Sequence, residues 1–140
     1  MIQRQQTLWL ILATVCAFLT FQFPFVTGKE VVANSTALVD IDIDAGENFY
    51  LLILTGASII LSLVTIFMFK DRILQGRLCL LGILIAAGII TVYIVRYTKI
   101  VNPVPALWCI LPFIVLISYI MAYRGIRHDQ RLVKSLDKLR

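Results

Sequence analysis

Charged residues are scarce in this sequence. They make up 15% of the 140 residues, and 60% of the residues are hydrophobic, whereas a soluble domain has about 25% charged and about 45–50% apolar residues. A soluble fold of this length cannot hide so much apolar surface from water. The composition therefore excludes an ordinary soluble domain and indicates a single domain whose solvent is largely lipid.

Asp, Glu, Lys, Arg and His are absent from the interior of four long apolar runs. The runs cover residues 8–26, 49–69, 78–95 and 104–123, and each is long enough for a helix that crosses a hydrocarbon layer of about 30 Å. Charged groups inside a membrane mark proton relays, ion paths and sites for charged substrates, so these functions are disfavoured. We predict an all-α, integral membrane four-helix bundle in which Pro112 kinks the fourth helix.

Cysteine, histidine and catalytic motifs are also sparse. Cys16, Cys79 and Cys109 each lie alone in an apolar run, a spacing that suits neither a disulfide framework nor a zinc site. The single histidine, His128, lies among charged residues near the C-terminus. The sequence has no nucleophile elbow, phosphate-binding loop or paired catalytic carboxylates. We therefore predict that the protein is not an enzyme and uses no cofactor and no metal.

Basic residues are present, but they gather beside the apolar runs. Ten of the thirteen lie at Arg4, in the Lys70–Arg77 connection and in residues 124–140. Cytoplasmic segments carry the excess of Lys and Arg in membrane proteins, so both termini are predicted to be cytoplasmic. This topology explains the net charge of +5, and nothing points to nucleic acid as a partner. A first run that is instead a cleaved signal peptide is the alternative.

The outer loop between the first two runs is acidic and contains VDIDIDAGE at Val39–Glu47. Its D-x-D-x-D opening resembles a calcium-binding loop, but Ala45 occupies the position that needs glycine and Leu51 the position of the bidentate glutamate. Strict alternation of apolar and acidic residues is typical of a short β-strand with one wet face. A β-segment is the favoured interpretation, with an irregular loop and a metal site as alternatives.

Small residues recur four positions apart in the second and third runs. They are Ser58 with Ser62 and Gly82 with Ala86, and this spacing lets helix backbones approach closely. These residues are candidates for helix packing within the bundle or for contacts with another protein. Pairing of the second and third helices is favoured, because their short connection makes them antiparallel neighbours.

The last stretch, residues 124–140, is both basic and amphipathic. On a helix its apolar side chains fall within an arc of about 140°, opposite most of the basic ones. Gly125 disfavours a continuous helix by about 1 kcal/mol, so we expect a bend there. We predict an ordered cytoplasmic helix, tucked under the bundle at the membrane surface or docked on a partner; a solvated tail is the alternative. The candidate lipid or partner contacts are Arg124, Arg127, Arg131, Leu132, Lys134, Leu136 and Leu139.

Three segments together resemble a known family. They are MIQRQQTLWLILA at the start, FMFKDRILQGRLCLL between the second and third runs, and RGIRHDQRLVKSLDKLR at the end. Over its whole length the chain is similar to domain of unknown function family 4293, small four-span inner-membrane proteins of Bacteroidota. His128, Gln130, Leu136 and Lys138 depart from the usual family tail. The resemblance implies the bacterial inner membrane and supplies no activity.

Two functions fit these features. The first is a non-enzymatic accessory or scaffold subunit of a larger inner-membrane protein complex, with membrane lipid as a further partner. The second is a small transporter or lipid-handling protein for an apolar or weakly polar molecule. The second function requires a central cavity, whose expected lining is Ser58, Ser62, Thr91 and Ser118. The sequence does not decide whether the protein forms homo-oligomers.

Overall fold

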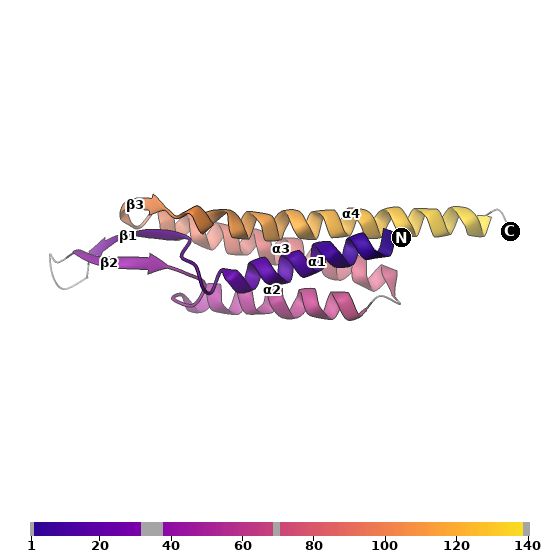
Figure 1. The fold of residues 1–140 in the computed structure, drawn as a ribbon, viewed down its shortest axis with the longest axis horizontal. Helices are drawn as coiled ribbons and strands as arrows, with labels where there is room; N and C mark the ends of the chain where they lie inside the picture. Colours follow the sequence, from indigo (N-terminus) through magenta and orange to yellow (C-terminus); the bar gives the residue numbers. More distant parts are fainter. Residues whose placement is uncertain (1, 32–37, 69–70, 139–140) are drawn as a thin grey trace.

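The fold is a bundle of four helices that carries a small sheet at one end. The computed structural model describes residues 2–31, 38–68 and 71–138. The helices are α1 (Ile2–Leu19), α2 (Phe49–Phe67), α3 (Arg72–Tyr97) and α4 (Leu111–Lys138). Each helix packs against the next along the chain, and α1 also packs against α4, so α2 and α4 face each other across a diagonal (Figure 1). The predicted helical bundle is confirmed.

Three helical segments are long and apolar enough to cross a membrane. They are Phe49–Phe67, Arg72–Tyr97 and Leu107–Leu136, whereas the apolar part of α1, Gln5–Leu19, is shorter. Many large apolar side chains point outward from these helices, and Leu84 on α3 is 73% exposed. Hydrocarbon is the environment in which such a surface is stable. The protein is therefore a multi-pass membrane protein.

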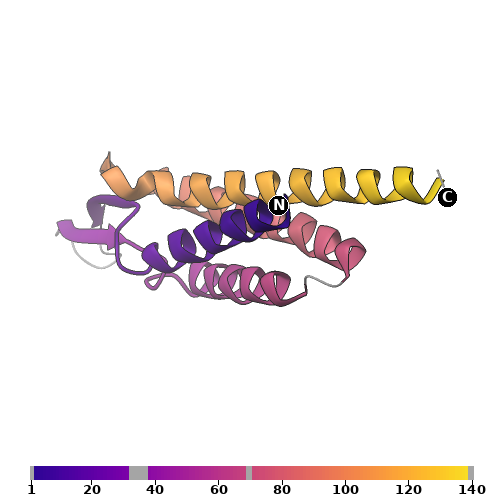
Figure 2. The ribbon, with the colours of Figure 1, turned by 45° about the vertical axis from the view of Figure 1, so that its right-hand side comes forward.

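A three-stranded antiparallel sheet lies at the end of the bundle opposite the two chain termini (Figures 1 and 2). Strand β1 (Val26–Val31) is central, between β2 (Leu38–Ile43) and β3 (Val101–Pro105). Strand β2 confirms the β-segment predicted from the alternating sequence. Strands β1 and β3 were not predicted, and β3 brings the connection between α3 and α4 onto the same sheet.

The ends of two predicted spans need correction at this sheet. Helix α1 ends at Leu19 and β1 begins at Val26, so the first run is not helical to its end. Pro24 prevents the helix from continuing to the end of the run, because a proline disfavours helical backbone at the residue before it. The fourth run was predicted to be helical from Val104, which lies in β3; its helix begins with the short 3-10 segment η1 (Leu107–Ile110) and continues as α4.

Helix α4 has neither the kink predicted at Pro112 nor the bend predicted at Gly125. Pro112 lies in the first turn of the helix, where a missing backbone N–H is tolerated. Gly125 lies inside the helix against α1, where an added Cβ would come within 2.9 Å of Cγ of Gln6. Glycine there leaves room for the side chain of Gln6. The helix therefore continues straight beyond the bundle (Figure 2), so the tail is not tucked under it.

Aromatic stacking fixes the sheet to the bundle. The ring of Phe25, just before β1, stacks on Tyr93 of α3 with 4.2 Å between centroids, and Phe23 stacks on Trp108 at 4.0 Å. The backbone N–H of Phe25 also donates to the carbonyl of Ile43 at 2.7 Å. A small hydrophobic cluster continues this contact into α2 and α3, and its buried members are Ile43, Leu51, Ile89 and Tyr93.

Candidate functional site

The centre of the bundle is occupied by Tyr119 of α4, which is fully buried. Its hydroxyl donates to the carbonyl oxygen of Ser58 at 2.8 Å, and the Ser58 Oγ lies 3.4 Å away. Because Ser58 belongs to α2, this contact joins the two diagonal helices. A buried tyrosine usually places its hydroxyl on a partner in this way. Tyr119 therefore links α4 to α2 through the centre of the bundle.

The predicted packing residues converge on this ring from two sides. Gly82 of α3 faces Tyr119, and a Cβ added to Gly82 would lie 2.6 Å from Cδ1 of the ring. Ser58 contacts the same tyrosine from α2. The small residues on α2 and α3 thus make space for a side chain from α4, which is a different use of the spacing from direct contact between those two helices.

The other two predicted packing residues serve different neighbours. The hydroxyl oxygen of Ser62 lies 2.7 Å from that of Thr14 on α1, and each of these hydroxyls also approaches a carbonyl of its own helix. Ala86 is buried and borders a cavity of about 10 Å³ beside Thr55 and Pro112. Such a volume is about that of one water molecule, and the Thr55 hydroxyl has no hydrogen-bond partner among the described residues.

The four residues that were expected to line a central cavity do not line a transport route. Ser58 and Ser62 are 1% exposed and Ser118 is 0% exposed, so no water-sized space adjoins their side chains. Thr91 lies on the outer surface of α3 and donates to the carbonyl of Ala87 at 2.8 Å. The central cavity that the transport hypothesis requires is therefore not formed by these residues.

Side-chain amides join the helices at the end that carries the termini. Nε2 of Gln6 donates to Oδ2 of Asp129 at 2.7 Å, and both residues are buried, which connects α1 to α4. Nε2 of Gln130 donates to the carbonyl of Arg72 at 2.8 Å, which connects α4 to α3. The Gln130 amide therefore joins α4 to the start of α3.

Sequence reasoning missed these amide contacts. Gln6 and Asp129 are 123 positions apart, and neither belongs to a recognisable motif. The available signal was weak: both are polar residues at the border of an apolar run, where a side chain can find partners on the neighbouring helix.

Beyond these contacts α4 projects past the other helices. Residues 131–136 are exposed, and Leu132, Val133 and Leu136 have relative exposures of 43, 44 and 66%. The guanidinium of Arg127 lies 5.4 Å from the ring centroid of Tyr123. Arg124, Arg131 and Lys134 are exposed, whereas the predicted contact Leu139 lies outside the described residues.

The apolar stripe on this projecting end continues the buried face of α4. At 100° per residue, Val133 and Leu136 fall within the same sector as the buried residues of the helix, and Leu132 lies about 40° beyond the edge of that sector. Those buried residues are Leu111, Val115, Ser118, Ala122 and Ile126. The projecting end therefore presents a core-type face with no described helix to cover it. We call Leu132, Val133 and Leu136 the tail stripe.

Acidic side chains at the sheet end are engaged locally. Asp44 Oδ1 accepts the backbone N–H groups of Gly46 and Glu47 at 2.7 and 2.8 Å, and Asp40 lies 3.8 Å from Lys29 on the neighbouring strand. Within residues 2–31, 38–68 and 71–138, no group of three metal-ligating side chains comes together. The aspartates thus close a turn and line the edge of the sheet.

Comparison with known proteins gives one match. The family model described as domain of unknown function (DUF4293) matches residues 2–139, which is nearly the whole chain. No curated protein and no solved structure matches.

Proposed function

The chain belongs to the DUF4293 family, and we propose that it is a non-enzymatic accessory or scaffold subunit that attaches to a larger protein complex of the bacterial inner membrane through the tail stripe. The observation that carries this proposal is the continuation of the buried face of α4 into Val133 and Leu136, with Leu132 beside them, all of which are exposed. Apolar patches on a projecting element are typical of interaction sites.

The expected partner has a groove with an apolar floor and an acidic rim. The floor would take the tail stripe, and the rim would face the basic side of the helix, which carries Arg127, Arg131 and Lys134. Charge complementarity of this kind favours encounter and correct orientation. The hydroxyls of Ser58, Ser62 and Tyr119 make contacts between helices, which agrees with a structural role.

The proposal includes a topology with four spans and both termini in the cytoplasm. Helix α1 has 18 residues, or about 27 Å of helix, and its outward side chains Leu8, Ile11, Val15 and Phe18 are apolar and exposed. These features suit a fourth span, although α1 is shorter in its apolar part than the other three. The excess of lysine and arginine at the termini end supports its cytoplasmic location.

An impermeant thiol reagent tests the topology. Asp42→Cys and Arg131→Cys place a thiol at each end of the bundle, and both positions are exposed. In intact cells from which the outer membrane has been permeabilised, Asp42→Cys should react and Arg131→Cys should react only after lysis. Labelling of both thiols before lysis would refute the proposed arrangement.

Co-purification tests the attachment. The full-length protein is extracted in mild detergent and its mass is measured under native conditions, where a larger complex is expected. Leu136→Asp should release the partner, whereas Ser135→Asp introduces the same charge beside the stripe and should leave the complex intact. A monomer or simple homodimer in the unaltered protein, or equal loss in both variants, would contradict the proposal.

A further inference from the structure

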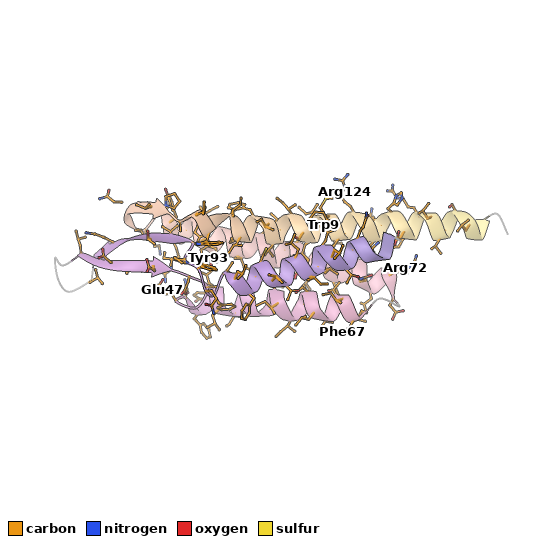
Figure 3. All side chains as sticks on the ribbon, in the orientation of Figure 1. Trp9, Glu47, Phe67, Arg72, Tyr93 and Arg124 are labelled. Carbon is orange, nitrogen blue, oxygen red and sulfur yellow. The ribbon has the colours of Figure 1, made fainter. Side chains whose placement is uncertain are left out.

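The outer surface between α1 and α4 is hollowed beside the termini end. One hollow of about 640 Å³ and a second of about 250 Å³ share Gln5, Trp9 and Met121 in their linings, so they form one groove. Figure 3 shows Trp9 and Arg124 on this side of the molecule. We call it the α1–α4 groove, and the remaining residues of its lining are Gln6, Leu8, Leu12, Arg124 and Gly125.

The groove is apolar along one part and polar along the other. Leu8 and Leu12 line only the larger hollow, and their side chains are 63 and 39% exposed. Gln6 and Arg124 line only the smaller hollow. Arg124 is the first charged residue after the apolar run of α4, and Gln5 and Gln6 lie shortly before the apolar run that begins at Leu8. The groove therefore crosses the level at which both helices pass from hydrocarbon to the headgroup region.

Arg124 brings an uncompensated positive charge to the polar part. It forms no ion pair or hydrogen bond with another residue of the described ranges, and the nearby carboxylate of Asp129 is bonded to Gln6. No acidic residue lines either hollow. An arginine at this depth can donate several hydrogen bonds to a phosphate. The charge of the groove thus complements an anion.

We propose that the α1–α4 groove binds one anionic phospholipid. Its phosphate receives hydrogen bonds from Arg124, with Gln5 beside the glycerol region, and one acyl chain lies along Leu8, Leu12 and Met121. Trp9, which lines both hollows, lies where the chain meets the headgroup, a common position for tryptophan. A soluble phosphate would leave the apolar part of the groove empty, which is why the amphiphile is the fitting ligand. This site does not depend on the tail stripe or its partner.

Fluorescence of Trp9 gives a direct test, because the chain has two tryptophans. Trp108 stacks on Phe23 near the sheet, and Trp108→Phe keeps an aromatic ring there and leaves Trp9 as the sole reporter. This variant is reconstituted in phosphatidylcholine vesicles that contain either brominated phosphatidylglycerol or the same fraction of brominated phosphatidylcholine. Occupation of the groove predicts stronger quenching by the brominated phosphatidylglycerol, saturating at a low fraction of that lipid.

Two arginine variants of one helix supply the matched comparison. Arg124→Gln should raise the phosphatidylglycerol fraction at half-maximal quenching roughly tenfold, as expected for loss of a charge-assisted hydrogen bond. Arg131→Gln removes the same charge about 10 Å farther along the helix, which is about one Debye length away. This variant should change the phosphatidylglycerol fraction at half-maximal quenching by less than about twofold. Arg124→Lys should recover most of the affinity, and circular dichroism checks that each variant keeps its helices.

Three outcomes would overturn the proposal. Equal quenching by the two brominated lipids would mean that Trp9 meets only bulk lipid. Equal effects of Arg124→Gln and Arg131→Gln would mean diffuse attraction of the basic end for an anionic membrane. Relief of quenching by millimolar inorganic phosphate would mean that the groove selects a soluble anion.

Discussion

The sheet end of the bundle and the end that carries the termini are held together by different interactions. At the sheet end, three strands satisfy one another's backbone groups, and the stacked pairs Phe23 with Trp108 and Phe25 with Tyr93 cover the helices. At the termini end, amides of Gln6 and Gln130 join neighbouring helices, and α4 then continues alone (Figure 1). At the sheet end, residues of the same chain cover the ends of the helices. At the termini end, the tail stripe and the α1–α4 groove are left exposed, and other molecules can cover them.

The difference also separates two kinds of residue on α4. The buried residues up to Ile126 pack mainly against α1 and α3, so their replacement should change the stability of the isolated protein. Residues of the tail stripe are exposed in the isolated protein, so their replacement should change association only. Substitutions at the sheet end, in the middle and at the termini end test this division in turn.

The largest effect is expected at the sheet end. Tyr93 is 1% exposed, and Tyr93→Ala should lower the free energy of unfolding by about 3–5 kcal/mol, because it removes a buried aromatic ring. Its hydroxyl has no partner among the described residues, so Tyr93→Phe should be neutral or slightly stabilising. Unfolding in mixed detergent micelles measures both. A loss of less than about 1 kcal/mol for the alanine variant would show that the sheet end is not tightly packed.

In the middle of the bundle, Gly82→Ala should destabilise the protein by about 1–3 kcal/mol, because the new methyl group overlaps the ring of Tyr119. The same substitution in a Tyr119→Ala background should have a much smaller effect, because the methyl group then enters a void. A double-mutant cycle in the same micelles measures the coupling between the two positions. Additive effects would mean that glycine is needed there for another reason.

At the termini end the amide contact should contribute less. Gln6→Ala removes the donor that meets Asp129 and should lower the free energy of unfolding by about 1–2 kcal/mol. Asp129→Ala should recover part of this loss in the Gln6→Ala background, because it removes the buried carboxylate that the first substitution leaves without its donor. A loss as large as that of Tyr93→Ala would remove the proposed difference between the two ends.

Much of the helical part was predictable from apolar length, since α2 coincides with a long uncharged run and α3 contains another. Helix α3 begins at Arg72, however, so most of the predicted Lys70–Arg77 connection is helical. The strand β2 was predictable from its period of two. Strand β3 was not, because Pro103 and Pro105 argue against a strand. They are accommodated because β3 lies at the edge of the sheet.

Errors in the helix ends came from ranking apolar length above proline position. Pro24 signalled the end of α1, and Pro112 was in a first turn, which sequence alone did not reveal because the start of α4 was placed too early. At the candidate site, the spacing of Ser58, Ser62, Gly82 and Ala86 identified buried positions. It could not reveal that two of them, Ser58 and Gly82, face Tyr119, because Tyr119 lies on α4, far from both in sequence.

The smallest effect on stability is expected on the tail stripe. Leu136 is 66% exposed, so Leu136→Asp should change the free energy of unfolding of the isolated protein by no more than about 0.5 kcal/mol. Leu51 is fully buried at the sheet end, and Leu51→Asp should prevent stable folding, because an unpaired carboxylate would enter an apolar cluster. Thermal unfolding in detergent compares the two. A strong loss at Leu136 would mean that the isolated chain already covers its own stripe, and the termini end would then be as complete as the sheet end.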